Sequence, residues 1–87
     1  MTIVEGDVSA QAHRVFKNLQ AVCAAAGGSM ADVVRVGIYL TDLADFAAVN
    51  AVMAEYFETP YPARSTIGVA ALPRGVPVEI DAVLVLA

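Results

Sequence analysis

The chain has 87 residues, a formal net charge of −4 and a mean hydropathy of +0.67, with 59% hydrophobic and 16% charged residues. Its five basic residues are scattered, so the basic stripe that nucleic-acid binding requires is missing. No apolar run approaches the roughly 18–20 residues that a membrane-spanning helix needs. This length without a linker, repeat or low-complexity segment predicts a single domain over residues 1–87.

The high apolar content predicts an oligomer. A domain of this size buries only about 60–65% of the surface that its unfolded chain exposes, and the leftover apolar surface marks an interface. The N-terminus lacks the features of a signal peptide, and a single cysteine suggests a reducing compartment, so a cytoplasmic location is expected. One cysteine and one histidine are too few for a usual zinc site, and nothing indicates a nucleotide or flavin, so we expect no cofactor.

The N-terminal third predicts an amphipathic helix after a short strand-like stretch at residues 2–5. Asp7 or Ser9 can cap the helix, and Gly27 with Gly28 ends it. Its apolar residues recur at spacings of three and four, which predicts one buried stripe. That stripe consists of Ala12, Val15, Phe16, Leu19, Val22, Cys23 and Ala26.

Two residues of this helix could carry chemistry. His13 is a possible acid–base group, but without a visible acidic partner we interpret it as a solvated histidine. Cys23 falls on the apolar stripe, where a small core residue is a better interpretation than a nucleophile.

Residues 29–32 have the form of a one-turn capping box leading into a central strand at Val33–Leu40. The alternation predicts that Val34, Val36, Ile38 and Leu40 share the core face. Arg35, on the other face, could contact an anionic ligand or pair with Asp81, and we favour the pair.

A second helix is predicted over residues 43–57. Thr41, Asp42 and Asp45 provide capping side chains, and Pro60 ends the helix. Asn50 is the polar member of its buried stripe, which otherwise holds Phe46, Val49, Met53, Tyr56 and Phe57. A buried amide needs hydrogen-bond partners, so Asn50 either ties down a neighbouring loop, which is the more common role, or contacts a ligand directly.

The last third predicts a β-hairpin. Two apolar runs, residues 65–72 and 76–86, are separated by Pro73, Arg74 and Gly75. Gly75 can adopt the positive φ that a chain reversal needs. The expected order of strand, helix, strand, helix, strand, strand gives an α+β fold with two helices on one face of the sheet.

Such a hairpin would place Arg64, Thr66, Glu79 and Asp81 together on the face that the helices leave open, with apolar residues on the other. Its register separates Arg64 from Glu79 by about six residues, on the order of 20 Å at ~3.3 Å per residue. We therefore expect these two side chains to act together only across an interface between subunits.

The segment PARSTIGVAALPRGVPVEIDAVLV resembles the C-terminal signature of the RidA (YjgF-like) family of reactive-imine deaminases. The preceding DVVRVGIYLTDLADFAAVNAVMAEYF is similar to the middle strand and second helix of that family. The resemblance covers essentially the whole chain. It implies a chorismate-mutase-like α/β sandwich with a mixed sheet, assembled as a homotrimer with active sites in the clefts between subunits.

The resemblance also implies a reaction, in which water adds to a 2-imino acid of the 2-aminoacrylate type to give a 2-oxo acid and ammonia. It places the substrate-carboxylate arginine at Arg64 and the water-positioning carboxylate at Glu79. Thr66 falls where many members have a cysteine, and Asn50 matches a position near the cleft. Arginine suits the first role because its guanidinium forms two parallel hydrogen bonds to a carboxylate.

Family members begin with two further strands, which supply a tyrosine and a Ser-Gly loop to the cleft, and neither can be carried onto this sequence. A shortened paralogue, a misassigned start and a fragment are all compatible with this difference. Two other functions stay open: a non-catalytic oligomer that binds small carboxylates, and a purely structural role for Arg64 and Glu79 as interface partners. A ribonuclease label also accompanies the family, and the net charge of −4 argues against it here.

Overall fold

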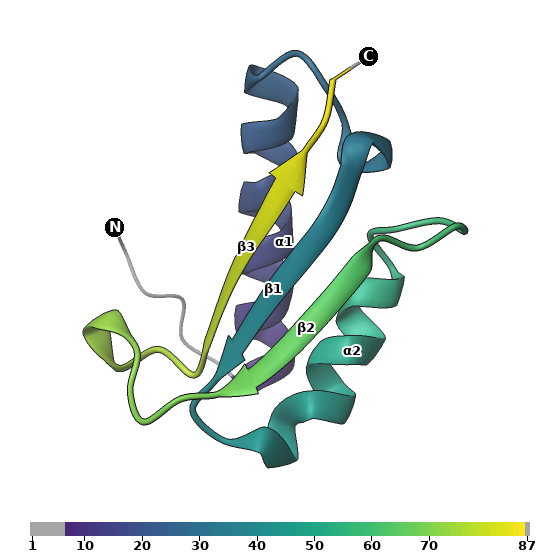
Figure 1. Cartoon of the computed structure of the whole chain (residues 1–87). Coiled ribbons are helices and arrows are strands. Elements are labelled where there is room, and N and C mark those ends of the chain that lie inside the picture. Colours follow the sequence, from purple (N-terminus) through teal and green to yellow (C-terminus); the bar gives the residue numbers. More distant parts are fainter. Residues whose placement is uncertain (1–6, 87) are drawn as a thin grey trace.

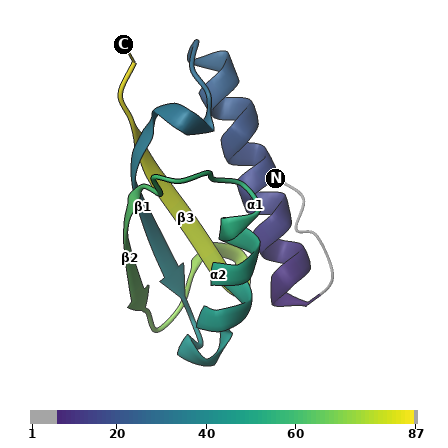
Figure 2. The same cartoon turned by 90° about the vertical axis from the view of Figure 1, so that its right-hand side faces the viewer.

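The computed structural model describes residues 7–86 (Figure 1). Within that range two helices, α1 and α2, lie on the same face of a mixed three-stranded sheet, as the turned view in Figure 2 shows. Among the described residues, no helix lies on the opposite face of the sheet (Figure 2). This arrangement confirms the predicted α+β class with helices on one face. The strand-like stretch expected at residues 2–5 lies outside the described residues.

Helix α1 spans Val8–Ala25, and its ends follow the sequence signals. The Asp7 carboxylate accepts a hydrogen bond of 2.9 Å from the backbone N–H of Ala10, which satisfies one of the free donors at the helix start. Gly27 has a φ of +89°, the left-handed conformation that commonly ends a helix.

The buried stripe of α1 is narrower than predicted. Ala12, Phe16 and Cys23 are buried, and Val15 and Leu19 pack partly against the core. Val22 is 64% exposed and Ala26 is also exposed, so the prediction for these two residues is wrong. Only one side of the helix contacts the sheet and α2, and these two residues fall outside that contact strip.

Strand β1, Val33–Leu40, is the central strand, and the capping turn before it forms as predicted. The Ser29 hydroxyl accepts from Ala31, and Asp32 accepts from the Ser29 backbone. One face assignment is wrong, because Val33 is buried and Val34 is 48% exposed. The register against β3 shifts between Val33 and Arg35, so Val34 and Arg35 are both exposed and the predicted alternation holds only from Arg35 onward.

The sheet order is β2-β1-β3, so the predicted hairpin is wrong. Strand β2, Ala63–Gly68, pairs in parallel with β1, and β3, Val78–Leu84, pairs antiparallel with the other edge of β1. Helix α2 provides the crossover that a parallel pair requires. Burial alternates residue by residue along β3 but not along β2, and alternation in a sequence does not reveal which strand is the neighbour of another.

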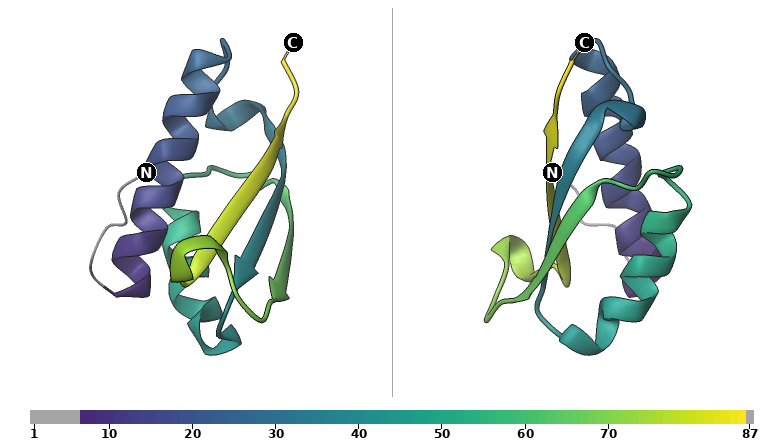
Figure 3. Two further views of the ribbon diagram at one scale, coloured as in Figure 1. Left: turned by 90° about the vertical axis from the view of Figure 1, so that its left-hand side faces the viewer. Right: turned by 45° about the vertical axis from the view of Figure 1, so that its right-hand side comes forward.

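The segment between β2 and β3 bridges the end of β1 instead of making a tight turn. Val69 donates to the carbonyl of Leu40, and Thr41 donates to the carbonyl of Pro77, so both ends of the bridge are tied to β1. At its tip, Gly75 has the expected positive φ, of 68°. Figure 3 shows this bridge at the end of the sheet opposite the C-terminus.

Helix α2, Phe46–Ala54, is shorter at both ends than the predicted residues 43–57, because Leu43–Asp45 form a 3-10 turn and residues 55–56 form a turn after Ala54. Asp42 caps that turn by accepting from Ala44 at 2.9 Å. The residues from this region that reach the core are Val49, Val52, Met53 and Phe57. Neither α1 nor α2 combines the length and the apolar character that crossing a membrane would take.

The two helices are joined by aromatic and polar contacts. Phe16 stacks on Tyr56 with ring centroids 5.3 Å apart. His13 Nδ1 lies 2.9 Å from the Tyr56 hydroxyl, and its Nε2 lies 3.6 Å from a Glu55 oxygen. The interpretation of His13 as a solvated residue without an acidic partner is therefore wrong, because the crossing of α1 and α2 supplies both partners.

Candidate functional site

Arg64 and Thr66 lie on the face of the sheet that the helices cover. Arg64 stands opposite Val36 in the β1–β2 register, and Thr66 stands opposite Ile38. Directly opposed residues share a face, and both partners are buried in the core. The predicted position of Arg64 on the open face is therefore wrong, because β2 pairs with β1 and not with β3.

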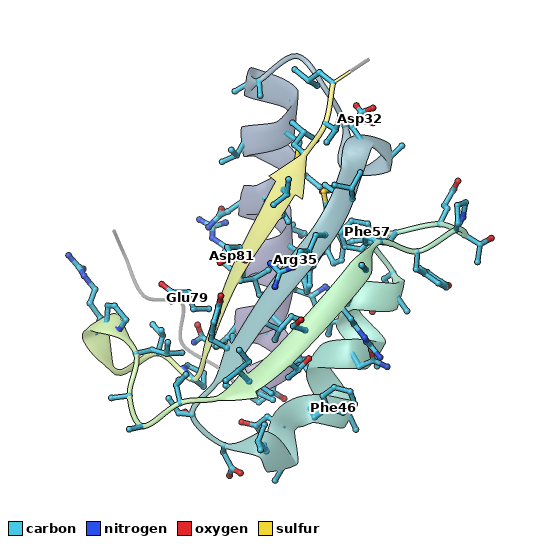
Figure 4. All side chains as sticks on the ribbon, viewed as in Figure 1. Asp32, Arg35, Phe46, Phe57, Glu79 and Asp81 are labelled. Atoms are coloured by element: carbon cyan, nitrogen blue, oxygen red, sulfur yellow. The ribbon has the colours of Figure 1, made fainter. Side chains whose placement is uncertain are left out.

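Glu79 lies on the opposite, open face. It stands across from Tyr39 in the β1–β3 register, and Asp81 stands across from Gly37. Figure 4 shows Arg35, Glu79 and Asp81 on the side of the sheet away from the helices. Within one chain, the sheet itself separates Glu79 from Arg64. We predicted that Arg64 and Glu79 of one chain would not meet because they lie far apart along a hairpin. They do not meet because they lie on opposite faces of the sheet.

The Arg64 guanidinium is held over an aromatic ring. Its central carbon lies 5.4 Å from the centroid of the Phe46 ring, a cation–π arrangement. This contact keeps the cation at the edge of a hollow of about 280 Å³ between α2 and the chain that leads into β2. The hollow is lined by Asn50, Met53, Ala54, Tyr61, Pro62 and Arg64. Arg64 and Asn50 thus come together, as required if both contact one ligand.

Thr66 contributes a buried hydroxyl without a hydrogen-bond partner within residues 7–86. Buried polar groups are nearly always paired, so this one is available to a water molecule or a ligand. Thr66 does not line the hollow beside Arg64. It stays a predicted substrate-binding residue.

A larger hollow of about 510 Å³ lies between the end of α1 and residues 56–60. Among the residues that line it, Tyr56 and Glu58 are the ionisable ones. It therefore offers no cation to a carboxylate, and the smaller hollow at Arg64 is the better candidate for an anionic ligand. The described part of the chain brings no three metal-ligating side chains together.

The open face carries a hydrogen-bonded pair that the sequence did not reveal. The Tyr39 hydroxyl donates to Asp81 at 3.0 Å. This hydrogen bond, together with the negative charge of Asp81, raises the pKa of the Tyr39 phenol above its ordinary value. The predicted partner of Asp81 was Arg35, and the structure gives Asp81 a neutral donor instead. The only sequence signal for this pair was that Gly37 and Tyr39 alternate with apolar residues along β1 and so share one face. That signal became informative once the β1–β3 register placed Asp81 opposite Gly37.

The same face exposes large apolar side chains. Ile67 is 51% exposed and Val83 is 48% exposed, on β2 and β3 respectively. Val85, which follows β3 and continues its open-face alternation, is 57% exposed. Apolar side chains gathered on one open sheet face mark a surface suited to contact with another chain.

Comparison with known proteins identifies the class. Residues 1–86 match the family model described as Endoribonuclease L-PSP. The chain belongs to this family, whose solved members include RidA, and this confirms the resemblance carried by the C-terminal motif. RidA from the Antarctic bacterium Psychrobacter sp. PAMC 21119 superimposes with a TM-score of 0.94 at 50% identity, covering 99% of this chain and 69% of that one.

Two relatives and one ligand-bound structure refine the comparison. Protein DfrA of Myxococcus xanthus is 58% identical over 85 residues, covering 98% of this chain and 65% of its own length. The 2-iminobutanoate/2-iminopropanoate deaminase of Dermatophagoides farinae is 45% identical over 84 residues, covering 97% and 66%. Escherichia coli TdcF with bound serine has a TM-score of 0.88 at 39% identity, covering 97% and 68%. The chain spans slightly less than two thirds of the length of these two relatives.

Proposed function

We propose that this chain hydrolyses reactive 2-imino and enamine acids, of the 2-aminoacrylate type, to 2-oxo acids and ammonia. The observation that carries the proposal is the Arg64 guanidinium, held by Phe46 at a hollow that also presents the Asn50 amide. The name of the mite relative supports the reaction class. The serine bound to TdcF supports a small amino- or imino-acid ligand.

Arg64 is suited to binding the substrate carboxylate. A guanidinium offers two parallel N–H donors to the two carboxylate oxygens and keeps its charge at any physiological pH. Asn50, in the same hollow, can donate to or accept from the imine end of the substrate. These two contacts would fix both the position and the orientation of a small 2-imino acid.

Glu79 is the proposed partner for water, and it must come from another copy of the chain. Within one chain the sheet separates it from Arg64, so a working site needs Arg64 of one subunit and Glu79 of a neighbour. The exposed apolar residues of the open face offer a surface for that assembly. We propose a homo-oligomer in the cytoplasm, a trimer by analogy with the family, with the site in the cleft between subunits.

The reaction proceeds in two balanced steps. Glu79 accepts a proton from water as the water oxygen bonds to the imine carbon, and passes that proton to the imine nitrogen, giving a neutral carbinolamine. Glu79 then takes the hydroxyl proton and delivers it to the nitrogen as the carbon–nitrogen bond breaks, so ammonia leaves, the hydroxyl becomes the carbonyl of the 2-oxo acid and Glu79 is again a carboxylate. Arg64 holds the carboxylate throughout and withdraws electron density from the carbon that is attacked.

The test is the release of 2-oxo acid and ammonia from enzymatically generated 2-aminoacrylate. The 87-residue chain is assayed with its oligomeric mass measured in the same sample. We expect faster release than in the uncatalysed reaction and an oligomer in solution. A well-folded oligomer that gives no acceleration would rule out the proposal.

The second candidate is a non-catalytic oligomer that binds small carboxylates. The observation that favours it is the serine bound to TdcF, a ligand that is not an imine. Calorimetric titration of the chain with serine and 2-oxobutanoate separates the two functions. Binding without turnover supports the second function.

A further inference from the structure

The open face of the sheet holds two carboxylates, Glu79 and Asp81, and Asp81 accepts a hydrogen bond from Tyr39. Glu79 and Asp81 are two residues apart on β3 and point to the same face, about 7 Å apart along the strand. Both side chains are exposed. Glu79 is the proposed acceptor of a proton from water, whereas Asp81 has no assigned role. For Glu79 to act alone, the Asp81 carboxylate must be held away from water and substrate.

Gly37 gives Asp81 a place to lie. Asp81 stands directly across from Gly37, and a Cβ added to Gly37 would collide with the Asp81 carboxylate. The same Cβ would come within 3.2 Å of the Tyr39 hydroxyl. The Asp81 carboxylate therefore occupies the space that any larger residue at position 37 would fill, close against the backbone of β1.

Tyr39 holds the carboxylate there. It stands directly across from Glu79, and its hydroxyl reaches diagonally to Asp81 at 3.0 Å. Because the pKa of the Tyr39 phenol is raised by Asp81, the hydroxyl stays protonated and keeps donating through neutral and mildly alkaline pH. Tyr39 thus connects the positions of both carboxylates.

The surrounding charges define what a released Asp81 would do. The charged or titratable groups of the described open face are Arg35 and Tyr39 on β1 and Glu79 and Asp81 on β3, while β2 contributes the uncharged Ala63, Ser65 and Ile67. A second free carboxylate would repel both the charge of Glu79 and the carboxylate of an approaching 2-imino acid. The hydrogen bond from Tyr39 holds the charged Asp81 carboxylate against β1 and so reduces that competition.

We propose that Tyr39 and Gly37 are positioning residues for Glu79. They hold Asp81 against β1, so that Glu79 is the free carboxylate that meets water and substrate. This inference rests on the proposed deamination, and it concerns side chains that do not themselves touch the reacting atoms.

The test is Tyr39→Phe in the 87-residue chain, compared with Tyr39→Phe/Asp81→Asn. Loss of the hydroxyl releases Asp81, so we expect KM for the 2-imino acid to rise roughly 3- to 10-fold, with a smaller change in kcat. The acid limb of the pH profile of kcat/KM should move to higher pH, because a neighbouring free carboxylate opposes the ionised form of Glu79. The double variant removes the released charge and should restore both quantities.

A merely structural role of Tyr39 would lower stability without this pattern. Thermal melting and oligomeric mass are therefore measured on every variant. Gly37→Ala is a second variant, since it displaces Asp81 while Tyr39 is kept, and it should also raise KM. A KM and pH profile unchanged in Tyr39→Phe, or a double variant that fails to restore them, would overturn the inference.

The failure of the proposed deamination has a different signature. If the unmodified chain shows no turnover but binds 2-oxobutanoate, the same variants are compared by Kd. Binding of 2-oxobutanoate that is roughly 3- to 10-fold weaker in Tyr39→Phe, and restored in the double variant, would uphold the positioning role. The expected change in Kd comes from repulsion between the released Asp81 carboxylate and the carboxylate of the ligand. An unmodified chain that neither turns over nor binds would overturn both proposals.

Discussion

The two faces of the sheet differ in burial and in the charges that they carry. The covered face is an apolar core in which Val36, Ile38 and Leu40 are almost fully buried, with Arg64 and Asn50 at its margin beside α2. The open face combines the carboxylates of Glu79 and Asp81 with exposed apolar side chains such as Ile67. Arg64, the proposed carboxylate-binding cation, and Glu79, the proposed catalytic carboxylate, therefore stand on opposite sides of one sheet. A site that needs both must be completed by a second copy of the chain.

The largest expected effect concerns Glu79. Glu79→Gln keeps the shape and removes the proton acceptor, so kcat for deamination should fall by about 10²–10⁴ while 2-oxobutanoate still binds. Assays of 2-oxo acid formation measure kcat, and calorimetric titration measures the binding of 2-oxobutanoate.

Mixing subunits tests the division of the site directly. Neither Glu79→Gln nor Arg64→Ala chains should be active alone, but oligomers containing both should regain part of the activity. Such hybrids contain some clefts with an intact Arg64 and an intact Glu79 from different chains. No recovery in proven mixed oligomers would contradict a shared site.

Arg64 is expected to have the next largest effect. Arg64→Ala removes the carboxylate partner from the hollow, so kcat/KM should fall by about 10²–10³, and Arg64→Lys should recover only a minor part because lysine lacks the bidentate geometry. Oligomeric mass and the melting curve should stay close to those of the unmodified chain. Loss of assembly in Arg64→Ala would favour the purely structural role of this arginine.

Isoleucines on the two faces provide a matched pair for stability and assembly. Ile38 is 2% exposed, so Ile38→Ala should cost about 2–5 kcal/mol in free energy of unfolding. Ile67 is 51% exposed, so Ile67→Asp should weaken the oligomer without a comparable loss of folding within the subunit. Denaturant unfolding and analytical ultracentrifugation distinguish the two outcomes. An Ile67→Asp variant that assembles normally would show that the open face is not the interface.

A smaller effect is expected where the helices cross. Tyr56→Phe removes the hydroxyl that contacts His13 but keeps the ring stacked on Phe16, so the free energy of unfolding should fall by about 1 kcal/mol. His13→Ala serves as the matched variant from the other helix. Effects of the two substitutions that simply add up would argue against a direct interaction.

The smallest effect is a pH dependence of stability at alkaline pH. The pKa of Tyr39 is raised in the folded chain above its value of 10.0 in the unfolded chain, so the stabilisation is complete below pH 10 and is lost as the pH rises through the folded pKa. Tyr39→Phe should abolish this component. Unfolding curves between pH 8 and 11 measure it, and identical pH slopes in the two proteins would contradict it.

Local signals were sufficient for several features. Asp7 begins α1 and Gly27 ends it, and the Ser29–Asp32 capping box forms, because each depends on hydrogen bonds or backbone conformations within a few residues. The local pattern failed at Val34, where a register shift against another strand changes the face, and at His13, whose partners come from the second helix.

The sequence by itself determined the two helices, the strands that follow them and, through its C-terminal motif, the family. These are properties of residue spacing and of short-range bonding. The core face of β2 was predicted wrongly, because Arg64 and Thr66 lie on the covered face and Ile67 is 51% exposed. Only the tertiary structure decided that β1 lies between β2 and β3, and hence that Arg64 and Glu79 stand on opposite faces. The physical reason is that alternation records which side of a strand is apolar but carries no information on which strand is its neighbour.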